Sequence, residues 1–111
     1  MYIITNRYVN NATRRYVEFL TAFDFGDSQD DAFFIDCGLT YDSVPTTTIS
    51  GLDHLEGETV SILADGATHA TKAVSGGNIT LDRSAQKVHV GLNYDSILQT
   101  LRIEAGAAQG V

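Results

Sequence analysis

Three histidines and one cysteine are the residues in this sequence with the greatest potential for metal or nucleophile chemistry. His54 lies in a turn-rich segment, His69 lies at a predicted hairpin tip, and His89 lies on the polar face of a predicted strand. Because this spacing gives no shared set of ligands, we predict no zinc site. Cys37 follows an apolar run and has no neighbouring base in the sequence, so we predict a buried, unreactive thiol.

The acidic residues suggest two further kinds of site. Four aspartates crowd the segment 23–31, but their spacing does not match an EF-hand calcium loop, so we expect them to cap backbone amides and face water. The sequence has no Gly-x-Ser-x-Gly elbow, no glycine-rich phosphate loop and no recognisable acid and base pair. We therefore predict no enzymatic activity, cofactor or metal; a hydrolase that uses Asp36 and His54 is the weakest alternative.

Length and charge restrict the class of protein. The chain has 111 residues, which suits one domain, and its net charge is −7. No Lys or Arg occurs between Arg15 and Lys72, a stretch with eleven of the fourteen acidic residues, so we predict no specific binding of nucleic acid. The sequence also lacks a long apolar run and a signal-like start, which predicts neither membrane insertion nor a signal peptide.

The apolar pattern favours short strands that end at turn residues. Asn10-Asn11 predicts the turn of a first hairpin, although a helix over 12–20 is an alternative. Asp65-Gly66 predicts a second hairpin, and the segment 51–57 predicts a turn with one helical revolution that ends at Gly57. The β-prone segments lie at 2–4, 8–9, 15–20, 32–41, 46–49, 59–64, 70–74, 78–81, 87–92 and 95–103.

These elements predict an all-β fold, a small β-barrel or β-sandwich of about seven or eight short antiparallel strands. We expect a single β domain over 1–104, with N-terminal hairpin or linker strands at 1–23 and a core region at 32–104. The residues 105–111 are predicted to be a flexible tail at the fragment end of a larger protein. The predicted core side chains are Leu52, Leu55, Val60, Ile62, Ile79, Leu81, Val88 and Val90.

Segments spread over nearly the whole chain carry a resemblance to a known family. They are 7–18 (RYVNNATRRYVE), 33–42 (FFIDCGLTYD), 48–57 (TISGLDHLEG), 60–66 (VSILADG), 74–82 (VSGGNITLD), 88–94 (VHVGLNY) and 98–101 (LQTL). In this order they resemble a domain of the nozzle or hub-type tail proteins of short-tailed phages and prophages. That domain is similar to the first catalytic-cysteine half-domain of ubiquitin-activating enzymes. The similarity implies a β-barrel-like fold without ubiquitin chemistry.

The resemblance implies a non-enzymatic structural module in a ring-like assembly of the virion tail, made in the cytoplasm of a bacterial host. Its implied partners are other copies of the parent protein and neighbouring tail proteins. A binding module for a glycan or host receptor, displayed on a virion or a cell surface, is the alternative. Tyr41 and Tyr94, which lie beside acidic turns in the sequence, would then form its aromatic platform.

Overall fold

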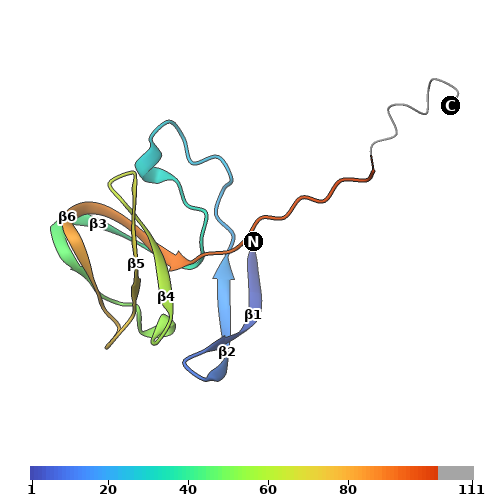
Figure 1. Cartoon of the computed structure of the whole chain (residues 1–111), viewed down its shortest axis with the longest axis horizontal. Coiled ribbons are helices and arrows are strands. Elements are labelled where there is room, and N and C mark those ends of the chain that lie inside the picture. Colours follow the sequence, from blue (N-terminus) through green and yellow to red (C-terminus); the bar gives the residue numbers. More distant parts are fainter. Residues whose placement is uncertain (103–111) are drawn as a thin grey trace, which may run out of the picture.

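The computed structural model describes residues 1–102, which form two antiparallel sheets and two short 3₁₀ turns (Figure 1). The expected all-β class is confirmed. The predicted tail at 105–111 lies outside the described residues. No helix in the described part of the chain is long and apolar enough to span a membrane.

The first sheet is the hairpin of β1 (Tyr2–Val9) and β2 (Ala12–Phe19). Its turn places Asn10 at φ 52° and Asn11 at φ 59°, the left-handed conformation that a two-residue hairpin turn requires. Asparagine tolerates this conformation better than most residues, which is why the sequence signal was reliable. The predicted hairpin is confirmed, and the alternative helix over 12–20 is wrong.

The second sheet has the strand order β3-β6-β4-β5. Its members are β3 (Asp36–Ile49), β4 (Thr59–Ala64), β5 (Ala67–Ala73) and β6 (Ile79–Leu92). In the described chain β3 and β5 form the two edges of this sheet, which is therefore open rather than a closed barrel. Asp65 and Gly66, both with positive φ, form the predicted turn between β4 and β5.

The two long strands β3 and β6 run through places where the sequence suggested a break. Pro45 interrupts no strand, because β3 is an edge strand and a missing N–H there costs no ladder bond. The expected connector at 82–86 is part of β6. Register shifts in the β3–β6 pair, between Asp36 and Leu39 and again between Asp42 and Thr48, bend the pair. The described residues therefore form six strands, two of them long.

The core lies against the curved four-stranded sheet. All eight predicted core side chains are buried, which confirms that expectation. The segment 50–57 contributes Leu52 and Leu55 to the core. Its 3₁₀ turn (η2, Asp53–Leu55) ends two residues before Gly57, close to the predicted end. The amide of Gly57 donates to the carbonyl of Val74, so this turn is fixed to the segment that follows β5.

Two predicted strand segments are not strands. The expected strand at 32–41 begins only at Asp36; residues 32–35 follow a 3₁₀ turn (η1, Gln29–Asp31) outside both sheets. The expected strand at 95–103 is absent over its described part, 95–102. A strand needs a neighbouring strand to share its backbone hydrogen bonds, and this segment pairs with neither open edge of the sheet; it leaves the body of the molecule (Figure 1).

Candidate functional site

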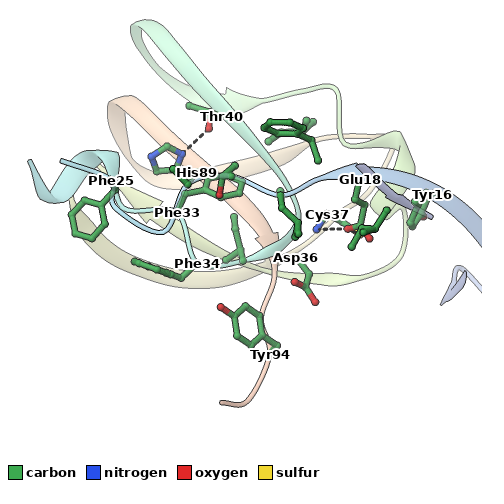
Figure 2. Close-up of a pocket in the computed structure, with 18 of the residues that line it drawn as sticks. Tyr16, Glu18, Phe25, Phe33, Phe34, Asp36, Cys37, Thr40, His89 and Tyr94 are labelled. Carbon is green, nitrogen blue, oxygen red and sulfur yellow. Dashed lines mark hydrogen bonds between the residues drawn. The ribbon is translucent and has the colours of Figure 1, made fainter. Parts of the chain in front are cut away.

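A groove of about 1040 Å³ separates the hairpin from the start of β3, and we call it the hairpin groove. Its walls are β2, the segment 20–25 and the segment 31–40, and Tyr94 lines it from the segment after β6. Figure 2 shows that Glu18, Cys37, Phe34 and Tyr94, which are far apart in the sequence, all surround this space.

Glu18 is the polar centre of the groove. Its carboxylate accepts hydrogen bonds from Thr5 Oγ1 (2.6 Å), Arg7 Nη2 (3.0 Å), and both the amide (3.2 Å) and Sγ (3.1 Å) of Cys37. Burial alone would raise the pKa of Glu18, but the hydrogen bonds from Thr5, Cys37 and Arg7 outweigh it and lower the pKa to about 2. The carboxylate is therefore charged at neutral pH and serves to hold the hairpin against β3.

Cys37 occupies an unusual backbone position. Its φ is 52°, at the bulge where β3 and β6 lose register, so its amide points to Glu18 instead of into the ladder. On the other side, His54 Nε2 donates to the carbonyl of Cys37 at 2.8 Å, and Tyr16 donates its hydroxyl proton to the carbonyl of His54. This chain of contacts connects β2, β3 and the 50–57 turn.

The Cys37 thiol is a poor nucleophile in this setting. Burial raises its pKa to about 12, and the neighbouring Glu18 carboxylate contributes to the rise. A thiol with this pKa is almost entirely protonated at neutral pH, so it lacks the thiolate that reaction requires. The structure agrees with the predicted lack of reactivity, although the residue is half-buried rather than buried.

Aromatic rings form the other wall of the groove. Phe23 and Phe25 each pack edge-on against Phe34 with ring centroids 5.7 Å apart. Phe33 packs edge-on against His89 at 5.3 Å. Sequence reasoning treated the segment 23–31 as a carboxylate loop; the phenylalanines interleaved with its aspartates were the signal that it missed.

The two tyrosines of the predicted binding platform lie at separate places. Tyr94 is exposed and lines the groove. Tyr41 is half-buried against the core, and its hydroxyl donates to the carbonyl of Val44 at 2.6 Å. Tyr41 pairs with Val88 near the middle of β6, whereas Tyr94 lies beyond the end of that strand. The two rings therefore do not form one surface.

The histidines are engaged separately, each with a backbone carbonyl. The predicted place of His69 at a hairpin tip is wrong: it lies within β5, paired with Ile62, and it bonds to the carbonyl of Ala70. His54 bonds to Cys37 as described. His89 was predicted to lie on a polar strand face, which is wrong: it is buried between the carbonyl of Asp30 and the hydroxyl of Thr40. The segment that contains η1 covers this side of β6, which the strand alternation alone did not indicate.

The acidic residues of the two suspected sites also have individual contacts. Asp24 caps the amide of Gly26, and Asp31 pairs with Lys87. Asp36 lies 3.5 Å from Arg7 and has no described contact with His54, so the hydrolase alternative gains no geometric support. Within residues 1–102, no three His, Cys, Asp or Glu side chains gather in a metal-binding arrangement.

The hairpin has an inverted polarity. Its inward side carries Thr5, Arg7, Tyr16 and Glu18, which make the polar contacts above. Its outward side, which we call the outer hairpin face, places apolar side chains opposite one another across the two strands. These exposed pairs are Tyr2 with Phe19, whose ring centroids are 5.2 Å apart, and Ile4 with Val17; the polar pair of Asn6 and Arg15 separates them from Tyr8 nearer the turn.

No family model matches this chain, and no curated protein has a significant match to it. These comparisons assign no family. The resemblance to phage tail proteins therefore remains an interpretation of the sequence segments that carry it.

Proposed function

We propose that this chain is a non-enzymatic structural module of a phage or prophage tail protein, and that it acts through protein–protein contacts in a ring-like assembly. The outer hairpin face is the observation that carries the protein-contact part of this proposal. Soluble monomers seldom expose a large continuous apolar patch, and such patches commonly mark interaction sites. The tail itself is inferred from the sequence resemblance.

The hairpin is fixed to the rest of the fold in a way that suits a contact surface for another protein. A two-stranded sheet is marginal by itself in water. Here the hydrogen bonds that Cys37 donates to Glu18 and Tyr16 donates to His54 fix it to the rest of the fold. The apolar side is consequently held outward in a defined position, at little cost in ordering when a partner binds.

The charge distribution favours another copy of the chain as the partner. The residues 1–19 contain three of the seven basic residues and only one of the fourteen acidic residues. The rest of the chain is strongly acidic, and Arg7 is already paired with Glu18 and Asp36, so the exposed Arg14 and Arg15 on the hairpin of one copy complement the body of the next. A contact between two different surfaces of identical subunits generates a ring when its rotation closes.

A binding module for a glycan or host receptor is the second candidate. The aromatic wall of the hairpin groove favours it, because Phe23, Phe34 and Tyr94 are all exposed beside a cavity. Glycan-array binding that is lost in Tyr94→Ala and retained in Tyr41→Phe would support this candidate over the structural one.

The tail proposal is tested on purified particles of the phage or prophage that encodes the chain. Antibodies raised against the chain are used for immunoblots of the particles and for immunogold electron microscopy. A positive immunoblot with label clustered on the tail supports the proposal. Particles that lack the chain on immunoblots, or that carry label only on the head, would overturn it.

A further inference from the structure

The segment 93–102, which we call the C-terminal arm, is an apolar strand-like segment without a sheet. Ile97, Leu98 and Leu101 are 87%, 89% and 92% exposed. A solvent linker is normally rich in Gly, Ser or Pro. This arm contains no Gly or Pro, and the residues 96–101 carry no charge. Such a segment gains free energy when another surface covers it.

The hairpin groove has apolar side chains beside its polar centre at Glu18, and it lies at the root of the arm. Tyr94 belongs to the arm and lines the groove at the same time. Exposed apolar side chains from two other segments also line it: Leu20 and Phe23 from one, Phe34 and Leu39 from the other. One chain thus carries both an uncovered apolar arm and an uncovered apolar groove.

We propose that the C-terminal arm of one copy docks in the hairpin groove of a second copy. This deepens the proposed function and rests on it for the identity of the partner, another copy of the chain. The groove is open and has apolar side chains beside its polar centre at Glu18, and the arm supplies Ile97, Leu98 and Leu101 to cover them. Repetition of this contact from copy to copy is head-to-tail and suits a ring.

The direction of the arm favours docking in the groove of a second copy over docking in the groove of its own chain. In Figure 1 the arm continues past the open end of the hairpin and away from the body. Fully extended, ten residues reach about 33 Å, comparable with the shorter dimensions of the molecule, 35 and 27 Å. The arm is long enough to reach a neighbour.

The net charge of the chain makes this self-association depend on the salt concentration. Each copy carries a net charge of −7, so two copies repel one another at low ionic strength. Salt screens this repulsion, while it leaves the apolar contact of the uncharged residues 96–101 intact. Self-association through the arm should therefore strengthen as salt is added, whereas the charge contact between the hairpin and the body would weaken.

The first test measures self-association of the full chain by sedimentation equilibrium at low and moderate salt. We expect the wild type to associate, and Ile97→Ser with Leu101→Ser to weaken association at least tenfold. The matched control Gln99→Ser changes a polar side chain of the same arm and should associate as the wild type does.

In the groove, Phe23→Ser should weaken association as the arm variant does. A wild type that stays monomeric up to about 1 mM, or an arm variant that associates normally, would overturn the proposal.

The second test separates a neighbour's arm from the chain's own arm. A Leu98→Cys variant is mixed with a Phe23→Cys variant under mild oxidation, and a disulfide dimer that contains one of each is expected. Replacement of Phe23→Cys by Ala73→Cys, on the exposed edge strand β5, is the control and should give little dimer. If the double variant Leu98→Cys/Phe23→Cys closes an intramolecular disulfide and the mixture gives no dimer, the arm docks in its own groove and the proposal fails.

Different results would reject the tail assignment and the docking of the arm in a second copy, which we call arm exchange. Immunogold label on the tail, together with a monomeric chain in solution, would retain the tail assignment and reject arm exchange. Arm-dependent association with no chain in the particles would retain arm exchange and reject the tail assignment.

Discussion

The Glu18 carboxylate accepts hydrogen bonds from both the amide and the thiol of Cys37, at 3.2 and 3.1 Å. These bonds join the N-terminal hairpin to the bulge of β3. The left-handed conformation of Cys37 turns its amide out of the ladder, and an unpaired amide at this half-buried position would be costly. Glu18 supplies the acceptor from a different sheet. The orientation of the hairpin, and hence the shape of the groove, depends on this pair.

Glu18→Gln should destabilise the fold by about 1–3 kcal/mol, because it removes a charged acceptor from four donors on Thr5, Arg7 and Cys37. The measurement is urea unfolding at pH 7. The control is Asp36→Asn, since Asp36 is more exposed and meets Arg7 at only 3.5 Å. An Asp36→Asn effect as large as that of Glu18→Gln would contradict the central role given to Glu18.

The same carboxylate predicts an acid dependence of stability. The folded pKa of Glu18 is about 2, below its ordinary value of 4.5. A lowered folded pKa contributes stability above the unfolded pKa and loses it as the pH falls through the folded pKa. We expect the wild type to lose about 2 kcal/mol more than Glu18→Gln between pH 4.5 and pH 2. Urea midpoints at these two pH values test this, and parallel losses in both proteins would refute it.

The sequence predicted those features that local chemistry determines. Asn10-Asn11 and Asp65-Gly66 indicated turns because few other residues adopt positive φ there. Alternating apolar residues such as Val88 and Val90 indicated the core. What the sequence did not predict depends on which segments meet in space: the cover over His89, and the missing partner strand for the C-terminal arm.

The hairpin groove was unpredictable for the same reason. Glu18 and Cys37 are nineteen positions apart, and nothing local to either indicates their contact. The inward side of β2 was ambiguous, because Tyr16 and Glu18 alternate with the apolar Val17 and Phe19. A sequence pattern would normally bury the apolar set, and this hairpin exposes it.

Val60→Asp or Ile79→Asp should abolish folding. Both side chains lie in the buried core, and an unpaired carboxylate there costs more than the stability of a domain of this size allows. Circular dichroism should show no cooperative melt. The control Thr80→Asp changes the exposed neighbour of Ile79 on β6 and should retain a melt. A normal melt for Val60→Asp would contradict the assigned core.

Gly91→Ala should destabilise the bulge by about 1–3 kcal/mol, since an added methyl group overpacks a filled space. A Cβ at Gly91 would lie 2.7 Å from the carbonyl oxygen of Asp36 and 2.9 Å from the Cα of Gly38. The backbone of β3 would have to move away, which also disturbs Cys37. Urea unfolding measures the loss, with Ser84→Ala on an exposed part of β6 as the control. Equal stabilities would show that the two strands have room at this point.

The outer hairpin face should contribute to assembly and little to the stability of the single chain. Ile4→Thr with Val17→Thr keeps two β-branched residues on the strands and removes apolar surface that is already exposed. The unfolding free energy from thermal melts should therefore change by no more than about 0.5 kcal/mol. If the chain has the proposed tail role, its incorporation into particles should fall. Thr48→Ser, at an exposed position of β3, is the control for both measurements. A large loss of stability would mean that this face is covered within the chain itself. Normal incorporation would mean that it is not a contact surface, and the structural role would have to rest on the groove and the arm alone.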